Sequence, residues 1–126
     1  MKHIPSYIEV LKNQILTGFE QESEDRLIIK TRDPAGVKHV YKFYHEQDCC
    51  ESVGITSIEG PDADAVVGKT LEDVAEDITN ADSRCDSSTT TTHTFAFSNG
   101  LTITVTWLGE SNGYYSESVS FAEVVG

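Results

Sequence analysis

The sequence predicts an α+β fold in which a mainly antiparallel sheet of about seven strands carries a short N-terminal helix and one small internal helix. Short segments that alternate apolar and polar residues, turn signals between them, and few segments with helical spacing lead to this prediction. Strands in such short-range order are typical of antiparallel hairpins and meanders. At 126 residues the chain has the length of one domain, residues 1–126.

Two parts of the chain carry helical signals. Ser6 and Glu9 have the spacing of a capping box, and apolar residues follow at roughly helical intervals, which predicts the N-terminal helix. Residues 62–67 can form one helical turn that Gly68 ends. Residues 70–79 fit either a helical stripe or an extended segment, and both remain open.

Short apolar runs bounded by turn residues predict the strands. The polar residues 21–25 are the first predicted hairpin loop, and Asp33-Pro34-Ala35-Gly36 is a turn signal. Residues 79–92 are rich in Ser, Thr, Asp and Asn, which predicts a mobile loop that enters a strand at its end. The predicted strands cover residues 14–20, 26–32, 37–44, 52–58, 93–97, 101–107 and 115–121.

The C-terminal third has the clearest strand pattern. From Leu101 to Trp107 apolar residues alternate with threonines, so the apolar set is expected to face the core and the threonines water. Asn99-Gly100 and Asn112-Gly113 are hairpin turn signals. We therefore expect the last three strands to form a meander.

Charge is distributed unevenly along the chain. Residues 1–42 contain seven Lys or Arg and six Asp or Glu, whereas residues 43–126 contain two and fifteen. A net charge of −12 repels phosphates and anionic membrane surfaces, so we expect a basic protein partner and neither direct nucleic-acid binding nor membrane binding. The candidate partner-binding residues are Asp62, Asp64, Glu72, Asp73, Glu76, Asp77, Glu110, Asn112 and Tyr114.

The sequence also bears on location and redox state. No apolar run approaches the ~20 residues of a membrane span, and the N-terminus lacks the features of a secretion signal. Three cysteines, two of them adjacent, are a poor basis for disulfides. We expect a cytoplasmic protein with reduced thiols.

A dense polar cluster lies between two predicted strands. It could bind zinc, with His93 and Cys85 completing the ligands, although the usual ligand spacing is absent. A thiol nucleophile is a second interpretation, which the neighbouring carboxylates oppose by disfavouring the thiolate. A third is structural, with cysteines filling space and acids bonded to loop amides. The candidate residues are His45, Asp48, Cys49, Cys50 and Glu51.

Residues 107–117 form the second motif. Gly109 and the Asn112-Gly113 pair suit a rigid bulged hairpin, while polar residues flanked by aromatics suit a recognition patch. The chain has no phosphate-binding glycine loop, no Ser/His/Asp motif and no His-x-x-x-His pair. These absences favour a non-enzymatic protein without a cofactor.

With these motifs the chain resembles a family of short uncharacterised bacteriophage and prophage proteins. The family is recognised by a His-x-Gln-Asp-Cys-Cys-Glu-x-Val segment, here His45–Val53, and a Trp-x-Gly-x-Ser-Asn-Gly-Tyr-Tyr-Ser-Glu-x-Val segment, here Trp107–Val119. The resemblance covers most of the chain, more weakly through residues 14–42. It implies a β-rich fold and a phage or mobile-element origin, but no role for individual residues.

Together these observations support the hypothesis of a phage-borne acidic interaction protein. It would act as a nucleic-acid mimic, inhibiting a host or defence protein by occupying its basic nucleic-acid-binding surface. The alternative is a metal-binding or small-ligand-binding protein, or a thiol enzyme, centred on the loop from His45 to Glu51.

Overall fold

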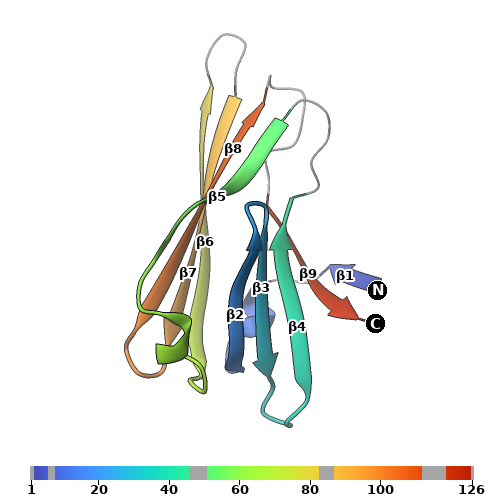
Figure 1. Cartoon of the computed structure of the whole chain (residues 1–126), viewed down its shortest axis with the longest axis vertical. Coiled ribbons are helices and arrows are strands. Elements are labelled where there is room, and N and C mark those ends of the chain that lie inside the picture. Colours follow the sequence, from blue (N-terminus) through green and yellow to red (C-terminus); the bar gives the residue numbers. More distant parts are fainter. Residues whose placement is uncertain (1, 6–7, 46–50, 83–86, 112–118, 126) are drawn as a thin grey trace.

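The chain folds into two antiparallel β-sheets that face each other (Figure 1). The computed structural model describes residues 2–5, 8–45, 51–82, 87–111 and 119–125. Sheet A has the strand order β1-β9-β4-β3-β2, and sheet B has the order β5-β8-β7-β6. The strands are β1 (Lys2–Pro5), β2 (Ile15–Ser23), β3 (Arg26–Arg32), β4 (Lys38–Tyr44), β5 (Glu51–Glu59), β6 (Leu71–Asp82), β7 (Ser87–Phe97), β8 (Thr102–Ser111) and β9 (Ser120–Val125).

The α+β prediction is wrong, because the helices among the described residues are two short 3-10 turns. These are η1 (Ile8–Leu11) and η2 (Ala63–Ala65). η1 buries Leu11 completely, and Asn13, at a φ of 69°, turns the chain away from helical geometry right after it. Neither turn is long or apolar enough to cross a membrane.

The internal segment that could be a helix is a strand. Residues 70–79 fall in β6, where Val74 is buried opposite Phe95 while Asp73 and Asp77 stay exposed. A helix would stack the acids of this segment four residues apart on one face, where like charges repel. The extended conformation separates them and lets apolar residues reach the core.

The predicted loop is wrong for residues 79–82 and 87–92, which belong to the end of β6 and to β7. The two strands pair from Leu71↔Phe97 to Asp82↔Ser87. Residues 83–86 lie outside the described residues. The four threonines at 89–92 have β-branched side chains, which suit the pleated surface of a sheet. In contrast, the strand predicted at residues 26–32 is confirmed with the same bounds as β3.

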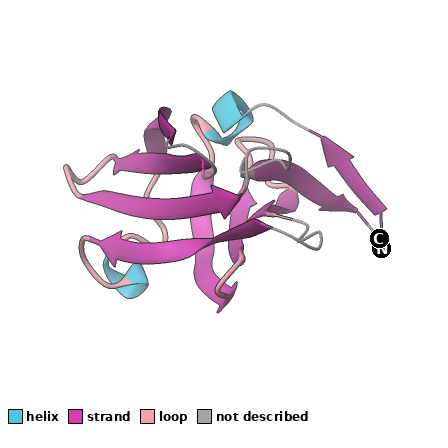
Figure 2. Cartoon of the chain, turned by 90° about the horizontal axis from the view of Figure 1, so that it is seen from above, coloured by secondary structure: helices cyan, strands magenta, loops and turns pink. Residues whose placement is uncertain are grey.

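The expected C-terminal meander is wrong as well. β8 pairs with β5 and β7 in sheet B, whereas β9 crosses to sheet A and pairs with β4 and β1. Phe121 of β9 stacks on Tyr41 with ring centroids 5.4 Å apart and lies 4.6 Å from Phe43. This aromatic packing accounts for the crossover, which brings the two termini side by side (Figure 2). The Asn112-Gly113 turn lies outside the described residues.

An aromatic core joins the two sheets. Phe43 of sheet A lies 4.5 Å from His93 and 5.8 Å from Phe95 of sheet B, measured between ring centroids, and Trp107 is fully buried beside them. Leu101, which was expected in the core, is 37% exposed because it ends the β7–β8 turn, where its N–H bonds the Asn99 side chain.

Candidate partner-binding edge

β6 is one of the two edge strands of sheet B, the other being β5, and most of its outer edge is unpaired within the described structure. Only the start of this edge is hydrogen-bonded by another described segment: the Asn13 N–H donates to the Leu71 carbonyl and the Leu71 N–H to the Gln14 carbonyl, both at 2.8 Å. η1 lies beside the next residues, from Val74 to Glu76. Beyond Asp73, β6 pairs with β7 alone among the described strands. An edge of this kind exposes a row of backbone donors and acceptors.

The side chains of β6 alternate between two faces. Val74 and Glu76 pair with buried residues of β7 and so face the other sheet, whereas Asp73 and Asp77 face outward. Asp62 and Asp64 belong to the η2 region, which lies beside the start of β6 (Figure 1). Six predicted acids, including Glu72, therefore follow one rim of sheet B.

Among the described residues, two of these acids have bonded partners and four do not. Asp73 Oδ1 forms an ion pair with Lys12 Nζ at 3.2 Å. Glu76 Oε2 lies 2.8 Å from Nε2 of the fully buried His93. Burial lowers the pKa of His93, and the carboxylate of Glu76 offsets this effect in part. No described residue bonds the carboxylates of Asp62, Asp64, Glu72 and Asp77.

A groove of about 460 Å³ runs beside β6, between η1 and the start of β9. Ile8, Val74 and Phe121 give it apolar walls, and Glu9 and Glu76 add carboxylates. No pattern in the sequence predicts this groove, because its walls come from three segments far apart in the chain.

Three buried polar atoms of sheet B lack a hydrogen-bond partner in the described structure: Thr91 Oγ1, His93 Nδ1 and Trp107 Nε1. Thr91 is the register partner of Trp107, and His93 follows two residues along the same face of β7. Buried polar groups are usually paired, so this cluster lowers the stability of the interior.

The remaining predicted partner-binding residues do not join the acidic rim. Glu110 lies on β8, with β7 between it and β6. Asn112 and Tyr114 are outside the described residues.

The metal or thiol site is described only in part. His45 is buried at the end of β4, and Glu51 begins β5. Asp48, Cys49 and Cys50 lie outside the described residues, as does the side chain of Glu51. The described part of the chain holds no group of three side chains that could bind a metal ion. Both interpretations stay predictions.

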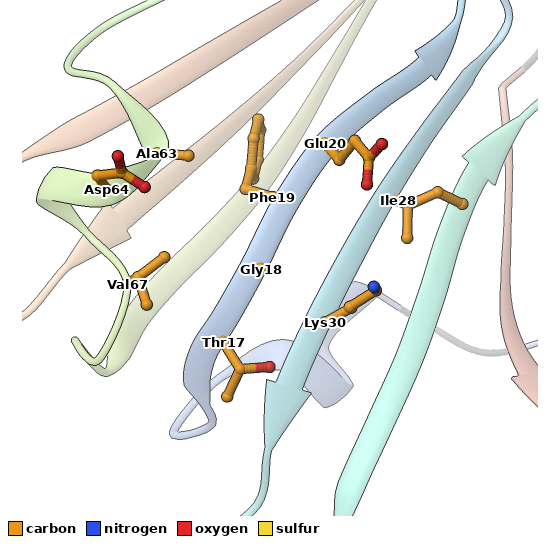
Figure 3. Close-up of a pocket in the computed structure, with 9 residues that line it drawn as sticks. All are labelled: Thr17, Gly18, Phe19, Glu20, Ile28, Lys30, Ala63, Asp64 and Val67. Carbon is orange, nitrogen blue, oxygen red and sulfur yellow. The ribbon is translucent and has the colours of Figure 1, made fainter.

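A second cleft, of about 430 Å³, separates η2 from β2 and β3 (Figure 3). Asp64 and Glu20 contribute carboxylates to this cleft, and Lys30 contributes an amine. The Lys30 side chain lies against Gly18, so that a Cβ atom on residue 18 would come within 3.3 Å of it. The lining has no thiol, hydroxyl–histidine pair or set of metal ligands, so it offers binding surface and no evident chemistry.

Sheet A has an outward face rich in cations, which total charge along the chain does not predict. In β3 and β4 the apolar residues face inward, and every second residue faces outward. This outer face has a groove of about 510 Å³ over Ile28, Val40 and Val124. Applying strand alternation to the charges would have revealed it. The cations on this face are Arg26, Lys30, Arg32, Lys38 and Lys42. Glu20 and Glu22 line the same groove, Glu22 pairs with Arg26 at 3.3 Å, and Lys42 is buried, so the face is basic in balance but not uniformly.

Comparison with protein families gives one finding. A family model described as "Domain of unknown function (DUF7448)" matches residues 8–121. The matched region runs from the first residue of η1 to the second residue of β9. No curated protein and no solved structure matches the chain.

Proposed function

We propose that the chain, which belongs to this domain family of unknown function, is a non-enzymatic interaction protein that presents carboxylates to a basic protein partner. The observation that carries the proposal is the acidic rim along β6 and η2, where four of six carboxylates have no partner among the described residues. Unpaired carboxylates along one rim create a local negative potential that favours association with a basic surface.

The proposed partner is a nucleic-acid-binding protein. An acidic rim that competes with phosphates would inhibit such a protein by occupying its basic surface. The resemblance to phage and prophage proteins supports a host or defence protein as the target. We place the encounter in the cytoplasm of the host cell.

Capture from a bacterial lysate on the immobilised full chain tests the proposal. Bound proteins are eluted with rising salt and identified by mass spectrometry. The captured protein is then purified and its nucleic-acid binding measured with and without the full chain. We expect salt-sensitive capture and competition with nucleic acid, because exposed charges are screened over about 10 Å at 0.1 M salt.

Matched variants separate the rim from total charge. One carries amides at four unpaired acids, and a control carries glutamine at four exposed acids elsewhere. Loss of capture by the first alone is the expected result, whereas equal capture by both would rule out the rim as the binding surface. The rim changes are Asp62→Asn, Asp64→Asn, Glu72→Gln and Asp77→Asn, and the control changes are Glu22→Gln, Glu24→Gln, Glu59→Gln and Glu110→Gln.

A further inference from the structure

The unpaired edge of β6 begins where the backbone hydrogen bonds from the N-terminal segment end, and η1 lies beside its first residues. The N-terminal segment exchanges two backbone hydrogen bonds of 2.8 Å with Leu71, and Lys12 pairs with Asp73 at 3.2 Å. From there on, residues 74–82 pair only with β7 among the described strands. Another strand could continue the pairing that the N-terminal segment starts, since edge backbone groups bind extended peptides in this way.

The inward side of this edge is apolar. Val74 and Phe121 line the groove beside it, and Ile78, the next apolar residue to face inward on β6, is 53% exposed. Successive side chains of a strand point to opposite faces. An added strand would therefore place every second side chain over the groove and beside Ile78, where apolar groups would cover surface that is now in water.

The outward side of the edge is acidic. Asp77 faces outward four residues beyond Asp73, and Glu72 is exposed beside them. Opposite charges on neighbouring strands stabilise pairing, and like charges destabilise it. Lys12, in the turn after η1, already forms an ion pair with Asp73 on this face at 3.2 Å.

We propose that β6 binds its partner by strand addition, through an extended partner segment in which apolar and basic residues alternate. The apolar residues lie over the groove between η1, β6 and β9, and the basic residues lie beside Asp77 on the outward face. This inference rests on the proposed function and specifies the partner segment: an unfolded or edge-strand stretch of a basic protein, bound through its backbone as well as its charges.

Synthetic peptides test strand addition on the full chain. The first peptide has nine residues that alternate arginine and valine, and the second has the same composition with the valines contiguous. Binding is followed by backbone amide resonances of the isotope-labelled chain. We expect the alternating peptide to bind about tenfold more tightly and to shift the amides of residues 74–82, since backbone pairing adds hydrogen bonds there.

N-methylated peptides separate backbone pairing from charge. Methyl groups are placed on alternate amides of the first peptide, in one set or in the complementary set. Only one set can face β6 in a paired strand, so we expect one methylated peptide to lose at least about tenfold in affinity and the other to change less than about twofold. Equal affinities for both methylated peptides would overturn strand addition.

The outcomes distinguish the two proposals. If all the peptides bind equally and salt releases them equally, the rim attracts basic partners through charge alone, and only strand addition fails. If no peptide binds, strand addition fails, and capture of a basic protein that depends on the rim still decides the proposed function.

Discussion

The outer face of sheet A and the β6 rim of sheet B carry opposite charges. Five of the nine Lys and Arg residues face outward from β3 and β4, whereas the unpaired carboxylates follow η2 and β6. The asymmetry between residues 1–42 and 43–126 thus becomes a separation in space. A net charge of −12 describes neither surface, and each should recognise a different kind of partner.

Substitutions in the core between the two sheets should lower the stability of the protein more than substitutions on either charged surface. Phe43 connects sheet A to His93 and Phe95 of sheet B, so Phe43→Ala should lower the free energy of unfolding by about 3–5 kcal/mol. Urea unfolding measures this loss. Val40→Ala, on the outer face of the same strand, should cost less than about 1 kcal/mol. Similar costs for the two variants would show that the sheets are not joined through Phe43.

Charge reversal compares the two surfaces directly. Replacing Glu72 and Asp77 by lysine should weaken binding of the captured partner about 100-fold, since attraction becomes repulsion at two positions. Replacing Lys30 and Lys38 by glutamate on sheet A should change it less than about threefold. Calorimetric titration at two salt concentrations measures both. A larger loss from the sheet A variant would place the partner on the basic face instead.

Removing an unpaired hydroxyl should stabilise the interior of sheet B. Thr91 is buried and its Oγ1 has no partner in the described structure, so Thr91→Val should raise the free energy of unfolding by about 1 kcal/mol. Thr92→Val, on the outward face, should change it by less than about 0.5 kcal/mol. Thermal unfolding of the three proteins checks the order. A destabilised Thr91→Val variant would mean that the hydroxyl is paired.

Alternation along single strands was predictable from the sequence, whereas the pairing of distant strands was not. The β3 bounds follow from β-branched residues between two turn signals. The pairing of Tyr44 with Ser120 joins residues far apart in the chain, and periodicity shows which face is buried without showing which strand lies next to it. The crossover of β9 to sheet A therefore required the structure.

The candidate site was predictable in its residues but not in its form. Glu72, Asp73, Glu76 and Asp77 stood out as acids, yet residues 70–79 fit two conformations equally well. Burial of Val74 against β7 selects the strand, and the free edge follows only from the order of strands in sheet B. The groove depends on β9 lying near η1, which is a consequence of the same crossover.

The two sheets also contain histidines with opposite electrostatic environments. In sheet A, His39 lies between Asp33 Oδ2 at 2.9 Å and Glu123 Oε2 at 3.3 Å, and its pKa is raised chiefly by the hydrogen bond to Asp33. In sheet B, burial lowers the pKa of His93 despite Glu76. Proton NMR titration should therefore place His39 above the ordinary value of 6.5 and His93 below it.

These directions set opposite pH dependences of stability. The contribution of His39 is fully present below pH 6.5 and is lost as the pH rises through its raised pKa. Because burial favours the neutral form of His93, the folded state loses stability relative to the unfolded state as the pH falls below 6.5. Asp33→Asn should move the titration of His39 downward and leave that of His93 in place. A shift of both histidines, or of neither, would contradict the separation of the two sheets into independent electrostatic environments.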